Sequence, residues 1–280
     1  MSATRRGFAP LADGGRLAYE LQGRDDGGVP LLLVRPLGGS MALWGEFGRR
    51  LAAARPLIAF DPRGVGDSSD ARWLESTRDM GRDTVELLDR LGIEKAHVFG
   101  LSLGGMVASW IALDAPDRVH HLVLGSTLPK PSKISRRIAH ELLPLARALA
   151  RPGLASELAL VHEILSPQFR AAHPERVLEI EATVRAHPTG GRNLACLVLA
   201  AARHHAAKRL RAIRAPTLLL AGEWDPIVGP RAEAELLHDI PGARLELIPR
   251  SGHDFSLEQP AFAAERIIAF LGGAPSIATA

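Results

Sequence analysis

Short apolar runs bounded by glycine and proline alternate along this chain with longer stretches in which apolar residues recur at helical spacing. Buried strands of a parallel sheet read as continuous apolar runs, and crossover helices separate them. The pattern therefore predicts an α/β protein with a mostly parallel sheet. The predicted strands are 17–21, 30–35, 56–60, 96–100, 119–125, 216–221 and 244–249, and the predicted helices between them are 43–54, 78–91, 103–115, 232–239 and 260–271.

The regular alternation stops after Gly125 and resumes at Pro216. The intervening segment is punctuated by proline and almost wholly helical in pattern. Its predicted helices are 133–150, 154–165, 174–187 and 192–213. We expect a lid over the strand ends, because open α/β sheets bind their ligands there. The predicted organisation is a core made of residues 1–128 and 214–280, with residues 129–213 as a helical cap.

Composition narrows the class of protein. At 280 residues with a net charge of +3, the chain is long enough for one large core and carries no strong charge bias. The basic runs 130–137 and 203–214 are broken by apolar residues at helical spacing, which favours solvated helix faces over a polyanion site. We expect neither a nucleic acid nor a membrane as partner, and a monomer or homodimer.

The cysteine content and the first residues of the chain add two further expectations. The single cysteine, Cys196, rules out an intrachain disulfide, and its apolar neighbours predict a buried thiol. The first residues are polar and are followed by no apolar stretch of signal-peptide length. We therefore expect a cytoplasmic protein.

Residues 97–106, His-Val-Phe-Gly-Leu-Ser-Leu-Gly-Gly-Met, run from a predicted strand directly into a predicted helix. A Gly-x-Ser-x-Gly sequence in this context is typical of a nucleophile elbow, a sharp turn that exposes a serine hydroxyl. Gly100 and Gly104 would relieve crowding around a strained Ser102, and the helix N-terminus favours negative charge. We expect Ser102 to be the nucleophile and the backbone N–H of Leu103 to stabilise an oxyanion.

A serine hydroxyl needs a base to take its proton, and that base needs an acid to orient it. His253 follows the last predicted strand and Asp225 follows the strand before it, so both fall on loops at the carboxyl edge of the sheet. The chain order Ser, Asp, His is the order found with a nucleophile elbow. Glu223 and Asp254 are the alternative acids. Asp225 is preferred because Glu223 lies nearer the strand and Asp254 adjoins the histidine itself.

The loop after the strand that ends near Arg35 is expected to supply a second oxyanion donor, the backbone N–H of Leu37. Arg35 has two open roles, to pair with a substrate carboxylate or to serve as a structural ion-pair partner. The residues that we predict to contact the substrate are Arg35, Gly38, Trp44, Trp224 and Phe255.

Residues 61–68, Asp-Pro-Arg-Gly-Val-Gly-Asp-Ser, look like a phosphate loop but lack its lysine and spacing. A glycine-rich turn held by hydrogen bonds of Asp61 and Arg63 is the favoured interpretation. The eleven histidines form no pattern of metal-ligand spacing, and apart from His253 we interpret them as structural. We therefore predict a protein without a metal ion.

Four motifs together resemble the α/β-hydrolase superfamily over nearly the whole chain: Asp61-x-Arg63-Gly64-x-Gly66-x-Ser68, Gly100-x-Ser102-x-Gly104-Gly105, Gly222-x-x-Asp225 and Gly252-His253. Pro36-Leu37-Gly38 with Trp44, and residues 100–106 with Trp110, are most similar to the 3-oxoadipate enol-lactonase group. The resemblance implies a doubly wound sheet with a helical cap inserted after the sixth strand, the roles expected above for the triad and the oxyanion donors, and no cofactor. The chain departs from many relatives by carrying Arg35-Pro36 where they have His-Gly.

These residues predict a serine hydrolase that cleaves a lactone or carboxylic ester of a small, largely apolar molecule through an acyl-enzyme. A serine at the elbow argues against dehalogenase or epoxide-hydrolase chemistry, for which the superfamily uses aspartate. Thioester and carbon–carbon bond hydrolysis stay open because the same triad serves both. So do non-hydrolytic activities, namely cyclase, lyase, perhydrolase-like or cofactor-free oxygenase chemistry, and a binding protein on the same scaffold, because a fold does not define a function.

Overall fold

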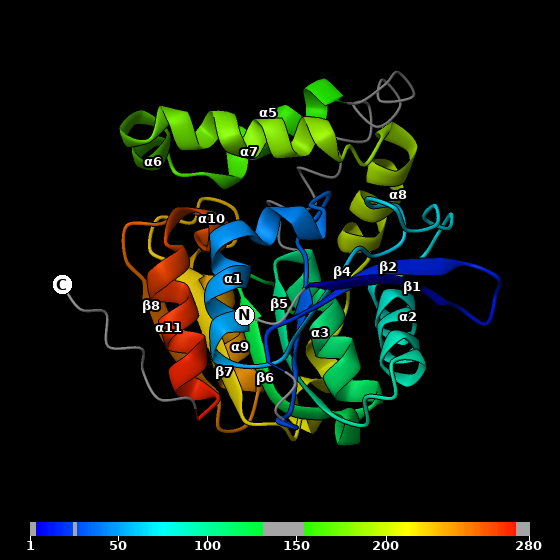
Figure 1. Ribbon diagram of the computed structural model, residues 1–280. Helices are drawn as coiled ribbons and strands as arrows, with labels where there is room; N and C mark the ends of the chain where they lie inside the picture. Colours follow the sequence, from blue (N-terminus) through cyan, green and yellow to red (C-terminus); the bar gives the residue numbers. More distant parts are fainter. Residues whose placement is uncertain (1–3, 25–26, 131–153, 273–280) are drawn as a thin grey trace.

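An eight-stranded sheet forms the centre of the protein in the computed structural model, which describes residues 4–24, 27–130 and 154–272 (Figure 1). The strands are β1 (Arg5–Pro10), β2 (Arg16–Gln22), β3 (Leu31–Val34), β4 (Leu57–Phe60), β5 (Ala96–Leu101), β6 (Val119–Gly125), β7 (Thr217–Gly222) and β8 (Arg244–Ile248). Their order is β1-β2-β4-β3-β5-β6-β7-β8, antiparallel from β1 to β4 and parallel from β4 to β8. This mostly parallel, doubly wound sheet confirms the predicted fold class.

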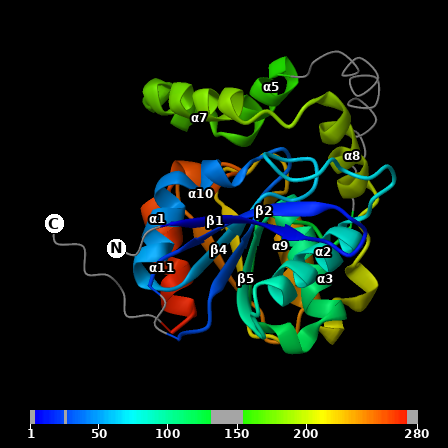
Figure 2. The same ribbon diagram turned by 45° about the vertical axis from the view of Figure 1, so that its right-hand side comes forward.

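Helices cover both faces of the sheet. The helices of the core are η1 (Met41–Trp44), α1 (Gly45–Ala54), α2 (Thr77–Arg90), α3 (Leu103–Asp114), η2 (Pro116–Arg118), α9 (Gly229–Asp239), α10 (Phe255–Glu258) and α11 (Pro260–Phe270). One apolar layer joins the sheet to α2, α3 and α9, and a second joins its other face to α1 and α11 (Figure 2). Strands β3, β4, β5 and β7 are buried along their whole length, and β6 is buried from Leu122 onward, which explains why these strands read as mostly apolar runs.

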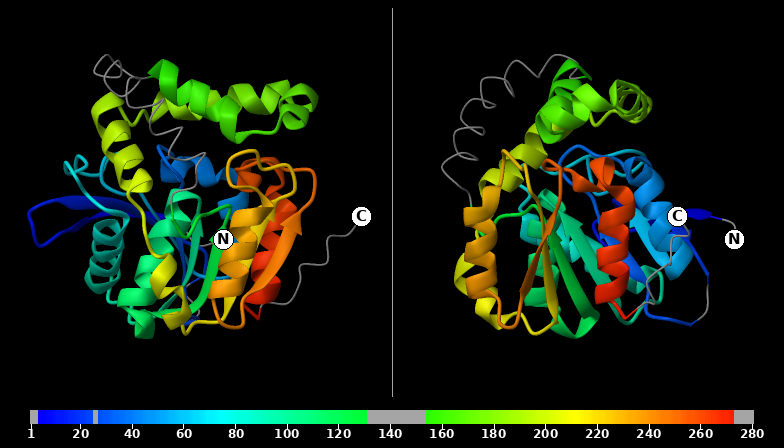
Figure 3. Two further views of the ribbon diagram at one scale, coloured as in Figure 1. Left: turned by 180° about the vertical axis from the view of Figure 1, so that it is seen from behind. Right: turned by 90° about the vertical axis from the view of Figure 1, so that its left-hand side faces the viewer.

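The segment between β6 and β7 carries four described α-helices: α5 (Leu154–Ile164), α6 (Pro167–Ala172), α7 (Pro174–Ala186) and α8 (Gly191–Ala202), followed by η3 (Ala207–Ala212). Helices α5 to α7 lie across the carboxyl edge of the sheet, and α8 descends toward the core (Figure 3). Their apolar side chains pack with Leu43 of η1 and Leu257 of α10. The expected helix 133–150 lies outside the described residues. No helix within the described ranges combines the length and apolarity needed to cross a bilayer.

The observed elements differ from the predicted ones in several places. The strand β1 and the short helices α6 and α10 were not predicted, and the single helix expected over 192–213 is broken between α8 and η3. The break buries His204, whose Nδ1 is hydrogen-bonded to Thr77 Oγ1 of α2 at 2.8 Å. Backbone N–H groups of Ala206 and Ala207 donate to Pro129 O, both at 3.0 Å. These contacts fix the place at which the segment after α8 returns to the sheet and its helices.

Candidate active site

Ser102 lies in a strained turn at the junction of β5 and α3. Its φ of 55° is in the left-handed region, which non-glycine residues rarely adopt. A Cβ atom at Gly100 would collide with Gly104 O, and one at Gly104 would collide with Val34 O. The two glycines therefore let strand, turn and helix approach one another as a nucleophile elbow requires. Thr127 Oγ1 donates to Ser102 O at 2.7 Å and secures the turn from β6.

His253 connects Ser102 to Asp225 through two short hydrogen bonds. Its Nδ1 lies 2.9 Å from Asp225 Oδ2, and its Nε2 lies 2.8 Å from Ser102 Oγ. A carboxylate only accepts, so Nδ1 carries the proton and Nε2 accepts from the serine hydroxyl. Asp225 Oδ1 in turn accepts from the backbone N–H of Ile227 at 2.8 Å and of Val228 at 3.0 Å. Three side chains far apart in sequence thus meet at the carboxyl edge of the sheet.

His253 and Asp225 are both buried, and each stabilises the charged form of the other. Burial of His253 would lower the pKa of its imidazole, but the charge and hydrogen bond of Asp225 raise the pKa above its usual value. Burial of Asp225 would raise the pKa of its carboxyl, but His253 and the two backbone N–H groups lower it. Asp225 therefore stays ionised at neutral pH, and His253 is a stronger base than an isolated imidazole.

The alternative acids have other partners. Glu223 is exposed and accepts from the backbone N–H of Arg250 at 2.9 Å. Asp254 is fully buried, accepts from Ser256 Oγ at 2.5 Å, and lies 3.5 Å from Arg35 Nη2. The side chain beside His253 therefore points away from the imidazole, as its position in the sequence indicates.

Arg35 is 2% exposed, and its guanidinium lies 4.3 Å from the centre of the Trp44 ring. Its Nη2 pairs with Asp254, whereas Nε and Nη1 have no hydrogen-bond partner among the described residues. Of the two roles left open by the sequence, the geometry supports the structural ion pair.

Two further residues expected to contact the substrate lie in the core. The ring of Trp44 contacts those of Phe47 and Phe99, which also contact each other, and Phe255 contacts Phe99. Both side chains belong to the buried layer beneath α1 and α11 and offer no open surface to a ligand. Their burial favours a packing role, and contact with a substrate stays a prediction, because the sequence places an aromatic ring near a motif but does not say which way it points.

The oxyanion-loop residues lie at the end of β3, next to the elbow. Val34 pairs with Gly100 in the sheet, so the loop that carries Leu37 and Gly38 begins beside Ser102. The N–H of Leu103 is in the first turn of α3, where a helix offers it no acceptor. Gly38 O accepts from Thr189 Oγ1 of the cap at 2.9 Å. Trp224 is half-buried on the loop that carries Asp225, and its backbone N–H donates to Ser251 O at 2.8 Å.

The glycine-rich turn after β4 has the structural role predicted for it. Asp61 Oδ1 accepts from the N–H of Met41 at 2.6 Å, and Ser68 Oγ donates to Asp61 O at 2.6 Å. Arg63 is ion-paired with Asp83 and Asp13. Burial raises the pKa of Asp61 to about 6. The turn holds η1 and the loop before it, rather than a phosphate.

One acidic residue near the site carries no sequence signal. Glu233 of α9 is 1% exposed, and the backbone N–H of Thr127 acts on its carboxylate. Burial, together with the charge of Asp225, raises the pKa of its carboxyl well above the usual value. In the sequence Glu233 looks like any polar helix position, so only tertiary packing distinguishes it.

Comparisons with known proteins agree with this geometry. A family model described as alpha/beta hydrolase fold matches residues 29–260, so the chain belongs to the α/β-hydrolase-fold family. A protein of Variovorax paradoxus (strain S110) named "Putative carbamate hydrolase RutD" is 32% identical over 91% of this chain and 96% of its own length.

Solved structures match over similar lengths. A hydrolase from Pseudomonas aeruginosa PA01 has a TM-score of 0.84 at 28% identity, covering 97% of this chain and 100% of its own. The enol-lactonase from Burkholderia xenovorans LB400 has a TM-score of 0.86 at 21% identity, covering 95% of this chain and 100% of its own. The enol-lactonase likeness expected from the sequence is confirmed at the level of the fold. Together with the family match, these relatives identify the chain as a hydrolase of this fold.

Proposed function

We propose that this chain is a serine hydrolase that cleaves an ester-type acyl bond of a small, largely apolar molecule through an acyl-enzyme. The observation that carries the proposal is the continuous hydrogen-bond chain from Asp225 through His253 to Ser102. A base at 2.8 Å from a hydroxyl is within the reach that proton abstraction needs, and the base is held by a third group.

In the proposed reaction Ser102 Oγ attacks the carbonyl carbon while His253 Nε2 takes the hydroxyl proton. The carbonyl oxygen becomes an oxyanion that accepts from the N–H groups of Leu103 and Leu37. Collapse of the tetrahedral intermediate expels the alcohol oxygen, which receives the proton from His253. Water then attacks the acyl-enzyme by the same steps and releases the acid. No cofactor is needed, because side chains and backbone handle both the proton and the charge.

The bond and the substrate class follow from what surrounds the triad. Arg35 is neutralised by Asp254 and buried, which favours a substrate without a carboxylate at that position. A lactone or carboxylic ester is therefore the leading substrate class. A carbamate is the second candidate, because the RutD relatives are similar over nearly the whole chain. A carbamate carbonyl is attacked by the same serine and differs in leaving a carbamoyl group on the enzyme.

The test combines covalent labelling with a matched substrate panel. A fluorophosphonate probe should add its mass to the peptide that holds Ser102, and Ser102→Ala should remove both the label and turnover. Ser109→Ala is the matched control, since this buried hydroxyl on the same helix donates to Gly105 O and should be dispensable. Aryl esters, lactones and aryl carbamates of equal size should separate the two candidates by rate and by the acyl mass retained. Label on another residue, or undiminished turnover in Ser102→Ala, would refute the proposal.

A further inference from the structure

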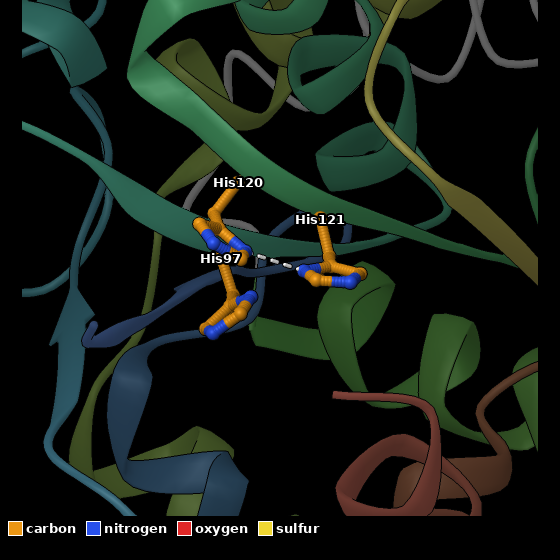
Figure 4. Close-up of side chains that lie close together, drawn as sticks. All are labelled: His97, His120 and His121. Atoms are coloured by element: carbon orange, nitrogen blue, oxygen red, sulfur yellow. Dashed lines mark hydrogen bonds between the residues drawn. The ribbon is translucent and has the colours of Figure 1, made fainter. Parts of the chain in front are cut away.

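Three histidines that the proposed reaction does not use lie together at the amino edge of the sheet. His97 comes from the start of β5, and His120 and His121 come from the start of β6. Figure 4 shows the three rings grouped together. Each ring offers one nitrogen such that the three atoms lie within 4.8 Å of one another. The rings contact one another edge-on (His97 and His120, 4.8 Å between centres) or tilted (His97 and His121, 5.0 Å; His120 and His121, 4.6 Å).

A register shift between β5 and β6 creates this cluster. Ala96 pairs with Val119, but Val98 pairs with Leu122, so two residues of β6 oppose the single residue His97. Successive side chains of a regular strand point to opposite faces, whereas a bulge re-aims one of them. The extra residue thus lets both His120 and His121 approach His97. A regular ladder would direct one of the two rings to the other face of the sheet.

One buried nitrogen of this cluster has no hydrogen-bond partner among the described residues. His97 is 3% exposed, and its Nδ1 is buried with no hydrogen-bond partner within the described ranges. The Nδ1 atoms of His120 and His121 lie 2.6 Å apart, so one of these two nitrogens must carry a proton for the other. A buried imidazole nitrogen without a partner costs free energy that a ligand would recover.

We propose that His97, His120 and His121 bind one divalent ion of the late first transition row, with Zn²⁺ as the resident ion. Imidazole nitrogens suit zinc, copper and nickel, whereas magnesium and calcium require oxygen ligands that these side chains do not provide. Three protein nitrogens leave a fourth tetrahedral position for water. His120 is exposed and His121 half-buried, so both rings are able to rotate toward the fixed ring of His97.

The geometry requires a modest adjustment. Zinc–nitrogen bonds of about 2.0–2.1 Å place tetrahedral ligand nitrogens roughly 3.4 Å apart. The His120–His121 pair at 2.6 Å must open, and the wider separations, up to 4.8 Å, must close. Two bonds to the ion then replace the hydrogen bond between these rings. The ion also joins β5 to β6 next to α11, where Phe270 packs edge-on against His121.

A nearby cation limits the affinity. Burial lowers the pKa values of both His97 and His121, and the charge of Arg55, whose Nη2 donates to Leu271 O at 3.3 Å, lowers them further. The same charge repels a metal ion. No thiolate or carboxylate belongs to the cluster. Binding should therefore be weaker than in zinc sites with cysteine ligands, whose negative charge attracts the ion.

The proposed ion would be structural and independent of the triad. His97 stands five residues before Ser102 on β5, which separates them by about 16 Å at the usual rise of a strand. Zinc bound at this edge should stabilise the fold and leave the hydrolytic rate unchanged. This consequence separates the metal proposal from the proposed function, because either can fail without the other.

The test uses the untagged full chain, stripped of metal with a chelator and titrated with Zn²⁺ by calorimetry at pH 7.5. One equivalent should bind and raise the unfolding temperature, whereas Mg²⁺ should do neither. His121→Asn should weaken binding by at least about tenfold, since even outer-shell changes at metal sites cost this much. His238→Asn is the matched control, because that histidine is exposed on α9 and lies outside the cluster.

A spectroscopic arm counts the ligands directly. The Cu²⁺-loaded protein should give an electron paramagnetic resonance spectrum with nitrogen couplings from three imidazoles, reduced to one in His120→Asn/His121→Asn. Both changed residues are at or near the surface, so the fold should survive the substitutions. Absence of saturable zinc binding would overturn the proposal. Unchanged affinity in the double variant, or zinc that binds only by competing with a probe at Ser102, would overturn it as well.

Discussion

A histidine that is 3% exposed lies near each end of strand β5, His253 at the carboxyl end and His97 at the amino end. The pKa values of the two imidazoles shift in opposite directions. At the carboxyl end, Asp225 raises the pKa of His253 above its usual value despite burial. At the amino end, burial, Arg55 and the two neighbouring histidines lower the pKa of His97 to about 3. At similar solvent exposure, the ring paired with Asp225 is a strong base, whereas the ring beside Arg55 is neutral and weakly basic. The charge and hydrogen bond of Asp225 together outweigh burial at His253, and at His97 burial is the largest cause of the lowered pKa.

The backbone differs between the two ends in a related way. The carboxyl end stores strain at Ser102, whose φ is 55°, and two glycines accommodate it. The amino end has a bulge in the parallel ladder and no residue of positive φ among 96–98 and 119–122. Strain of this kind aims a single hydroxyl at a base, whereas the bulge gathers side chains of one type.

The largest expected effect on activity comes from removing the carboxylate beside His253, because this imidazole, like that of His97, would then lack a negatively charged partner. Asp225→Asn preserves the shape of the side chain but removes the charge that orients and stabilises the imidazole. We expect kcat to fall by about 10⁴-fold with little change in fold, as for other serine hydrolases that lose this acid. Steady-state kinetics on an aryl ester measures the loss. Glu223→Gln, on the same loop but exposed, should retain near-normal activity; equal losses in the two variants would mean that the charge of Asp225 has no special role.

A second substitution tests whether the carboxyl end depends on its buried ion pair. Asp254→Asn keeps an acceptor for Ser256 Oγ but leaves the guanidinium of Arg35 without its nearest counter-charge. We expect a loss of about 3 kcal/mol in the free energy of unfolding, at the lower end for a broken buried pair because Asp61 still acts on Arg35. Urea denaturation measures it. Asp89→Asn, which breaks an exposed pair with Arg118, should cost less than about 1 kcal/mol.

How much of these two ends was predictable depends on whether the signal is local. The elbow can be predicted from the sequence because the two glycines that its crowded turn requires, Gly100 and Gly104, lie within two residues of Ser102. The central strands are equally clear, since burial on both faces demands unbroken apolar runs. Strand β1 was missed because its sequence is polar and mostly exposed, and it exists only through pairing with β2.

Other features depend on tertiary packing that one sequence does not display. The positions of Asp225 and His253 after strands pointed to the triad, but nothing marked Arg35 as buried against Trp44. The histidine cluster joins residues 23 and 24 positions apart through a one-residue register shift. Sequence spacing therefore gave no metal-ligand pattern, and the expectation of no metal was drawn from spacing alone. Steric requirements among residues close in sequence can be predicted from the sequence, whereas a shift in the register of two strands cannot.

The pH dependence of activity sharpens the contrast between the two rings. Only neutral His253 accepts the serine proton, and its pKa is raised above 6.5. Activity should therefore fall as pH drops below a value higher than 6.5, by at least about tenfold at pH 5.5. His253 contributes stability that is full below pH 6.5 and lost as pH rises through its folded pKa, so stability and activity should change in opposite directions there. Profiles of kcat/KM and urea stability check both; an acid limb below pH 6 would contradict the raised pKa.

The smallest effect concerns Glu233, a carboxyl buried beside Asp225 without a counter-charge of its own. Its folded pKa is raised, so below pH 4.5 both states are protonated and nothing is lost, whereas above pH 4.5 the unfolded chain ionises and the fold loses stability. Glu233→Gln removes this ionisation, so the unfolding free energy at pH 7 minus that at pH 4 should become more positive by on the order of 1 kcal/mol. Comparing two pH values within each protein cancels the packing effects of the substitution. The exposed Glu235→Gln should leave the pH dependence as it is in the unmodified chain. If Glu233→Gln also leaves the pH dependence unchanged, then Glu233 ionises in the folded protein as readily as in the unfolded chain. Burial without a counter-charge would then not shift the pKa of this carboxyl, contrary to the effect of burial on His97.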